Sequence, residues 1–507
     1  MLRPPRRAVP RLQVLLAVLL ASAAAVANAD AGWFESGDTQ LRTDLQVLND
    51  AEVIRLPISQ WPLPRAAVRY ALANAKTYVA TNAGVAAALD RVRARVGMDE
   101  RGETQPNAGA QFNAEVFGGQ QPLWRDFDTP AREDGELHAS GAYDSEHFSI
   151  GLEVAGVTDP EDGQDVRLDG SHATAQLGNW LVSANALDRW WGPGHEGSLI
   201  LSSNARPMPT LMVDRAAAMP FETKWLSWLG PWRMSFGVSQ MESEREDIDS
   251  PLFMAWRIVI MPFKDMELGF SRTAQFCGEE LECNLKVFGN LLAGNDNVGF
   301  DATPENEPGN QMAGFDIRWG SPIGSLPYAI YGQYVGEDES SYMPAKYLGQ
   351  LGLEIWHPYV DGGMLQMFAE YANTTCSGMS SRGPYYNCAY RQGRFDVEGY
   401  RYRGRVIGHP TDADSESYSL GAIYTAADGA LWTATARAAR LNHDGFDPQN
   451  SASQNPARYA ALELSWRGVM FGQSMSVEIG AEATEPEGGE RDVEPFGFIG
   501  WRHEFRP

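Results

Sequence analysis

The segment formed by residues 188–209 combines two adjacent indoles with charged side chains, amide groups and Gly-Pro turns. Trp190 and Trp191 offer flat apolar faces on which the C–H faces of sugar rings could stack. An Arg side chain can hold a carboxylate through two parallel hydrogen bonds, and Asn, His and Glu can bond to hydroxyl groups. The polar side chains concerned are Asp188, Arg189, His195, Glu196, Asn204 and Arg206. This chemistry makes the segment a candidate binding site for a polysaccharide.

The same segment also fits a structural role. Its Trp-Gly-Pro-Gly turn at residues 191–194 and its Asn-Ala-Arg-Pro run at residues 204–207 could belong to a loop folded into the protein interior. Salt bridges would then hold the charged groups, and the indoles would pack against the rest of the chain. Both interpretations remain open at the level of the sequence.

Catalysis is not indicated by the acidic residues near this segment. Hydrolysis of a glycosidic bond needs two carboxyl groups at a defined separation. Glu196 and Asp214 qualify only because they are acidic and near the segment, and a chain with 66 Asp and Glu residues contains such pairs by chance. The acidic runs elsewhere lack EF-hand spacing, and no Gly-x-Ser-x-Gly elbow appears at a strand-to-helix turn. We therefore predict no enzyme activity, no cofactor and no metal site.

The stretches of chain that must position this segment have a side-chain pattern that repeats every two residues. Apolar side chains alternate with small or charged ones in residues 148–155, and the pattern recurs in residues 232–239, 460–467 and 475–482. Successive side chains of a strand point to opposite faces. Repeated strands with one apolar and one polar face indicate a transmembrane β-barrel, here with roughly sixteen to twenty strands. Charges of both signs on the polar faces predict salt bridges across the lumen.

The first residues indicate export from the cytoplasm. Four arginines precede an apolar run at residues 12–26, and Ala27-Asn28-Ala29 suits cleavage. We predict a signal peptide at residues 1–29 and a mature chain that begins near Asp30.

Residues 30–105 differ from the strands that follow. Leu41, Leu45 and Leu48 are spaced for one face of a helix. A later helix is predicted from Ala83 to Val96, with Asn82 as its N-cap and Gly97 as its stop. We predict a small α-helical periplasmic module at residues 30–105 and a β-barrel at residues 106–507.

The net charge limits which partners the chain can bind, and the cysteine spacing predicts its disulfides. The formal net charge is -25, which argues against nucleic acid as a partner. The cysteines form two close pairs, and export exposes them to an oxidising compartment. Zinc binding is disfavoured because neither pair has a His at ligand spacing or a Cys-x-x-Cys motif. We predict one local disulfide within each pair, which are Cys277 with Cys283 and Cys376 with Cys388.

The residue order of the 188–209 segment closely resembles the central signature of the Wzi family of capsule-assembly proteins, found in the outer membrane of Gram-negative bacteria. Residues 41–45 with 61–64, residues 331–346 and residues 399–416 are also similar to that family. The resemblance covers nearly the whole mature chain. It implies an all-β transmembrane barrel of about eighteen antiparallel strands with a helical module at its periplasmic end, and it implies no catalytic residue.

The resemblance also implies a function. We expect an outer-membrane, lectin-like protein that binds capsular polysaccharide or exopolysaccharide and retains it on the cell surface. Outer-membrane lipid and the polysaccharide export machinery are further expected partners. The alternative is a diffusion porin with an open lumen for small solutes or saccharides.

Overall fold

The computed structural model describes residues 31–76, 82–98, 109–129, 131–279, 281–293, 310–323, 326–340, 343–378, 383–391, 397–445 and 447–505. The predicted signal peptide, residues 1–29, lies outside these ranges. Within them, no helix is both long and apolar enough to cross a membrane.

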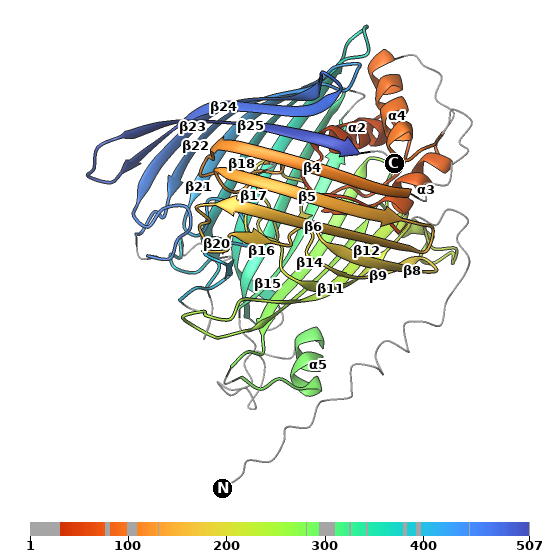
Figure 1. The fold of residues 1–507 in the computed structure, drawn as a ribbon. Coiled ribbons are helices and arrows are strands. Elements are labelled where there is room, and N and C mark those ends of the chain that lie inside the picture. Colours follow the sequence, from red (N-terminus) through yellow and green to blue (C-terminus); the bar gives the residue numbers. More distant parts are fainter. Residues whose placement is uncertain are drawn as a thin grey trace, which may run out of the picture.

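Antiparallel strands close into a barrel in which β25 pairs with β4 (Figure 1). The wall strands are β4 (Gly109–Gln120), β5 (Gly135–Asp144), β6 (Phe148–Thr158), β8 (His172–Leu177), β9 (Trp180–Asn185), β11 (Thr210–Arg215), β12 (Trp232–Gln240), β13 (Leu252–Ile260), β14 (Met266–Phe276), β15 (Gln311–Gly320), β16 (Tyr328–Ser340), β17 (Met343–Pro358), β18 (Met364–Gly378), β21 (Glu416–Thr425), β22 (Leu431–Leu441), β23 (Ala457–Met470), β24 (Gln473–Pro486) and β25 (Asp492–Phe505). The two-residue β7 (Val166–Arg167) pairs with β6, which also pairs directly with β8. In the described chain, eighteen strands therefore close the wall, and the predicted barrel is confirmed.

The wall carries its apolar side chains on the outer face and its polar side chains on the inner face, the reverse of a water-soluble protein. Ile150, Leu462 and Ile479 point outward and are 53%, 68% and 58% exposed, whereas their neighbours Ser149 and Glu463 are buried. An apolar outer face and a polar inner face are what a strand needs when lipid lies outside. The period-two prediction for these strands is thus confirmed.

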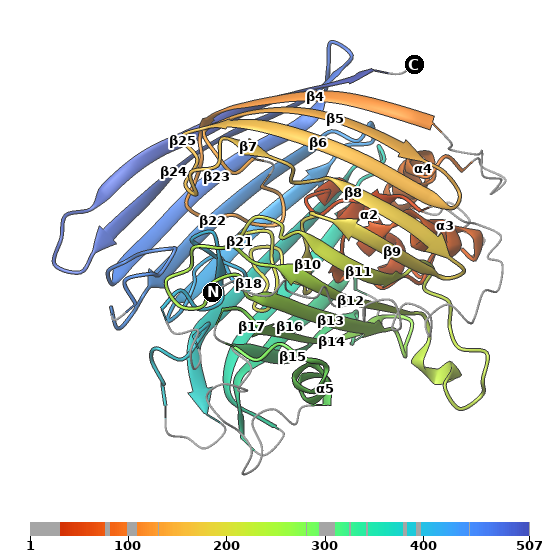
Figure 2. The same ribbon diagram turned by 60° about the horizontal axis from the view of Figure 1, so that its bottom comes forward.

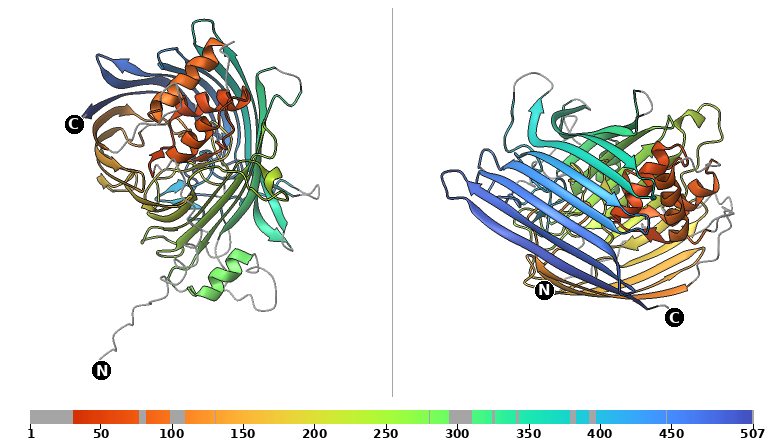
Figure 3. Two further views of the ribbon diagram at one scale, coloured as in Figure 1. Left: turned by 90° about the vertical axis from the view of Figure 1, so that its right-hand side faces the viewer. Right: turned by 90° about the horizontal axis from the view of Figure 1, so that it is seen from above.

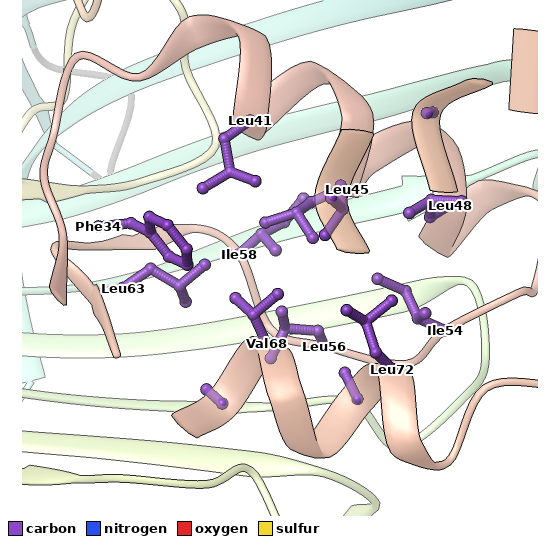
Figure 4. Close-up of a cluster of buried hydrophobic side chains, with 14 of the residues drawn as sticks. Phe34, Leu41, Leu45, Leu48, Ile54, Leu56, Ile58, Leu63, Val68 and Leu72 are labelled. Carbon is purple, nitrogen blue, oxygen red and sulfur yellow. The ribbon is translucent and has the colours of Figure 1, made fainter. Parts of the chain in front are cut away.

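Three helices lie together at one end of the barrel (Figure 3). They are α2 (Thr39–Asp50), α3 (Arg65–Ala73) and α4 (Ala83–Arg95). Leu41, Leu45 and Leu48 are buried on α2 as predicted, and they meet Val68 and Leu72 of α3 in one apolar cluster (Figure 4).

The ends of α4 follow the local signals in its sequence. The Asn82 side chain accepts hydrogen bonds from the backbone N–H groups of Gly84 and Val85 at 3.0 and 3.2 Å, and so caps the helix start. Gly97 follows the helix with a φ of 64°, a left-handed conformation that glycine adopts without a steric penalty. Both predictions for this helix are confirmed.

Short strands and loops complete the fold. β1 (Trp33–Phe34) pairs with β3 (Leu63–Pro64), β2 (Gln60–Trp61) with β10 (Trp190–Trp191), and β19 (Arg401–Tyr402) with β20 (Arg405–Val406). The connection between β11 and β12 holds the 3-10 helix η1 (Ser227–Leu229), and that between β14 and β15 holds α5 (Leu285–Ala293). In Figure 1, α5 lies away from α2–α4. Both predicted disulfides, Cys277–Cys283 and Cys376–Cys388, are present.

Candidate functional site

The candidate binding segment lies inside the barrel. After β9 the chain turns into the lumen, and it rejoins the wall only at β11; we call residues 186–209 the lumenal segment. Trp190, Leu199, Ile200 and Ser198 are fully buried. Figure 2 shows β10, which belongs to this segment, within the ring of wall strands. The described cavities beside it are small, about 20 Å³ next to Ser202 and about 10 Å³ next to Trp61.

The two indoles join the lumenal segment to the helical module and to the wall. Trp190 pairs through its backbone with Trp61, and its ring contacts Phe127 edge to face at a centroid distance of 5.4 Å. Its Nε1 donates a hydrogen bond to the carbonyl oxygen of Gly194 at 3.0 Å. Trp191 is buried in a second cluster that includes Phe253 of the wall. Neither indole presents an open face to a sugar ring.

Four polar side chains of the lumenal segment, those of Asp188, Arg189, Asn204 and Arg206, each have a partner in the chain. Arg189 donates to the Oδ1 of Asn185 at 2.6 Å, and Asn204 donates through Nδ2 to a carbonyl oxygen, that of Val406, at 2.9 Å. Arg206 binds Asp169 through two hydrogen bonds of 2.8 and 2.9 Å and also pairs with Asp162. Asp188 pairs with Arg132 at 2.6 Å.

His195 and Glu196 form a turn that the wall strands hold through carboxylates. The Nε2 of His195 lies 3.0 Å from Oε2 of Glu354 on β17, and its ring stacks on Phe368 at 4.3 Å. The carboxylate of Glu370 on β18 accepts hydrogen bonds from the backbone N–H groups of His195 and Glu196 at 2.8 and 3.2 Å. These bonds fix the position of the turn within the lumen.

Two arginines of the wall connect the segment and the helical module. Arg437 on β22 pairs with Glu196 of the lumenal segment, with Asp126 of the β4–β5 loop and with Glu463 of β23. Arg318 on β15 binds Asp50 at the end of α2 through two hydrogen bonds of 2.8 Å. The predicted salt-bridge network across the lumen is therefore present.

A second segment, residues 397–415, covers the lumenal segment. The backbone N–H of Ser202 donates to the carbonyl oxygen of Ile407 at 2.9 Å, and Tyr400 donates through its hydroxyl to the carbonyl oxygen of Ile200 at 2.7 Å. Burial lowers the pKa of His409 to about 3, so this side chain is neutral between the two segments. The sequence did not predict that residues 397–415 enter the lumen. The only sign of their importance was that residues 399–416 are similar to the Wzi family.

Arg42 of α2 bonds the helices directly to the lumenal segment. Its guanidinium donates to the carbonyl oxygens of Pro193 and Gly194 at 2.6 and 2.8 Å, and it lies over the ring of Phe127 at 4.4 Å. Within the helical module, burial raises the pKa of Asp44 to about 6 although Arg91 of α4 opposes that shift. The helices and the lumenal segment thus form one continuous packed body inside one end of the barrel.

The sequence profile of the capsule assembly protein Wzi family matches residues 103–488, well over half of the chain. The chain belongs to this family. The solved structure of Wzi, an outer-membrane protein involved in group 1 capsule assembly in Escherichia coli and a carbohydrate-binding β-barrel, superposes with a TM-score of 0.79. The match covers 94% of this chain and 100% of that one, at 25% identity. The predicted family and the outer-membrane location are confirmed.

A further relative is an uncharacterized 55.8 kDa protein in the cps region of Klebsiella pneumoniae. It is 32% identical over 334 residues, which is 65% of this chain. The match spans 63% of the length of that relative.

The contacts of the lumenal segment help to decide whether it binds polysaccharide or is an internal structural loop of this Wzi-family barrel. The structure places all seven predicted binding residues in the lumenal segment, where each has protein partners or is buried. These contacts favour the interpretation of an internal loop held by ion pairs. The assignment of Trp190, Trp191, Arg189, His195, Glu196, Asn204 and Arg206 to polysaccharide binding stays a prediction.

Proposed function

We propose that this Wzi-family barrel binds capsular polysaccharide or exopolysaccharide at the outer surface of the cell and retains it there. The observation that carries the proposal is the match along 94% of the chain to a carbohydrate-binding barrel involved in capsule assembly. The mechanism is non-covalent and needs neither catalysis nor a cofactor. A polymer meets many copies of the barrel at once, so weak single sites add up to firm attachment through avidity.

The proposal includes an orientation in the membrane. Barrels of this kind have short periplasmic turns and long extracellular loops. The turn between β23 and β24 at the helix end consists of Phe471 and Gly472, whereas the connection from β18 to β21 at the other end runs from residue 379 to residue 415. We therefore place the barrel end that holds α2–α4 on the periplasmic side, where the helices are available to the export machinery, and the apolar outer face of the wall against outer-membrane lipid.

Retention is tested by deleting the gene for this chain in the strain that carries it. We expect the total amount of polysaccharide to stay constant while most of it moves from the cell-bound fraction into the medium, because synthesis and export do not depend on a retention protein. The measurement is the ratio of cell-bound to shed polymer, with the wild-type gene supplied on a plasmid as the control. An unchanged ratio would contradict the proposed function.

Conductance distinguishes retention from the porin alternative. Because the lumenal segment and residues 397–415 fill the lumen, we expect the purified barrel in a planar bilayer to conduct roughly tenfold less than an open porin with a similar number of strands. An open porin of that size, measured in the same salt, is the reference. Large and steady conductance steps from this chain would show that the lumen is open.

A further inference from the structure

The loops opposite the helices bring together an aromatic pair from two distant parts of the chain. Tyr386 comes from the connection between β18 and β21, and His443 comes from the connection between β22 and β23. Their rings are parallel within 2° at a centroid distance of 5.8 Å, and the Tyr386 hydroxyl lies 3.5 Å from Nδ1 of His443. Tyr386 is 40% exposed and His443 is also exposed. Unlike the indoles of the lumenal segment, this pair is open to solvent.

An amide and a carboxylate lie directly beside the aromatic pair. The Nδ2 of Asn387 donates a hydrogen bond to Oδ2 of Asp444 at 2.5 Å, and both residues are half-buried. An amide group offers donors and an acceptor, and a carboxylate accepts several hydrogen bonds at once. Neighbouring hydroxyl groups of a sugar ring need this combination of a donor and an acceptor.

The position of these side chains is fixed by the fold. The buried disulfide Cys376–Cys388 closes the loop that carries Tyr386, and the N–H of Tyr385 donates to the carbonyl oxygen of Cys376 at 2.9 Å. On the other side, the N–H of His443 donates to the carbonyl oxygen of Asp414 at 2.8 Å. The carboxylate of Asp414 in turn accepts a bond from the N–H of Asn387 at 2.8 Å. Because both loops are held together before a ligand arrives, little conformational entropy is lost on binding.

We propose that Tyr386, Asn387, His443 and Asp444 form a subsite for one pyranose residue of the retained polymer. The C–H face of the sugar lies on the outer face of the Tyr386 ring, which His443 supports from behind, while the sugar hydroxyl groups donate to Asp444 and accept from Asn387. Because the subsite presents the carboxylate of Asp444 to the ligand, we expect a neutral sugar to bind in preference to a uronate. This inference rests on the proposed function and locates where that function is carried out.

The test is binding of the purified full-length barrel in detergent to immobilised extracellular polysaccharide from the strain that carries this chain. We expect Tyr386→Ala to weaken binding roughly tenfold, because it removes the ring on which the sugar stacks. His443→Ala should weaken binding less, because it removes only the ring that supports Tyr386 from behind. Both variants should still show the heat-dependent shift in gel migration of a folded barrel. Free neutral monosaccharides such as galactose or glucose should compete for the polymer, whereas glucuronate should not.

The chain offers a matched control for the aromatic substitution. Tyr359 is also 40% exposed and also contacts a histidine ring, His357, at 5.2 Å, but it lies in the turn between β17 and β18 at the helix end. Tyr359→Ala should bind the polymer like the wild type. If Tyr386→Ala and His443→Ala also bind like the wild type, the subsite is wrong while the proposed function stands. If the wild-type barrel itself does not bind the polymer, the proposed function fails.

The disulfides provide a second, independent comparison. Replacing Cys376 and Cys388 together with Ser frees the loop of Tyr386, so we expect polymer binding to fall several-fold while the barrel stays folded. Replacing Cys277 and Cys283 together with Ser frees the loop before α5 and should leave binding unchanged. Equal binding by the two double variants would contradict a subsite that depends on the position of Tyr386.

Discussion

Replacing Arg437 with Leu is expected to lower the free energy of unfolding by about 3–5 kcal/mol and to loosen the lumenal segment. The guanidinium of Arg437 is shared by the carboxylates of Asp126, Glu196 and Glu463, all of which are buried. Removal of this one cation leaves three buried carboxylates without their common partner. Breaking a buried ion network by removing one member is far more costly than losing a surface ion pair.

Thermal unfolding of the detergent-solubilised protein measures this loss, and planar-bilayer conductance measures the release of the segment. Arg440→Leu is the matched control, because Arg440 lies on the same strand but is exposed. Arg437→Lys should lie between the wild type and Arg437→Leu, because an ammonium keeps the charge but cannot reproduce the fork of hydrogen bonds. If Arg437→Leu unfolds and conducts like Arg440→Leu, the network does not hold the segment in place.

The barrel could be predicted from the sequence because the relevant signals are local. A strand with one apolar and one polar face shows its period within eight residues, as residues 148–155 do. The start of α4 was equally readable, because Asn82 caps a helix through atoms only two and three residues away.

The interior of the barrel depends on contacts between distant residues, which the sequence does not display. Trp190 pairs with Trp61, and Ser202 bonds to residue 407. An indole that stacks on a sugar and an indole that packs inside a protein have the same side chain, so residue type could not decide the role of Trp190. The pairing of Tyr386 with His443 was equally hidden, since the sequence predicted for that loop only a disulfide between Cys376 and Cys388.

Replacing Trp190 with Ala is expected to lower the free energy of unfolding by about 3–5 kcal/mol. The indole is fully buried, contacts Phe127 and sits where β10 pairs with β2. The substitution therefore leaves a cavity at the junction of the helical module and the lumenal segment. Hydrogen exchange should become faster in residues 60–64 and 190–194, while strands on the far side of the wall keep their protection.

Trp225→Ala is the control, because Trp225 is 74% exposed in the connection between β11 and β12; it should change neither stability nor exchange. Trp190→Phe should recover much of the lost stability, because a smaller aromatic ring still fills part of the cavity. Polysaccharide retention should then follow stability across the series of Trp190 variants. If retention falls in a variant whose stability and hydrogen exchange match the wild type, Trp190 contacts the polymer directly, and the lumenal segment must open to admit it.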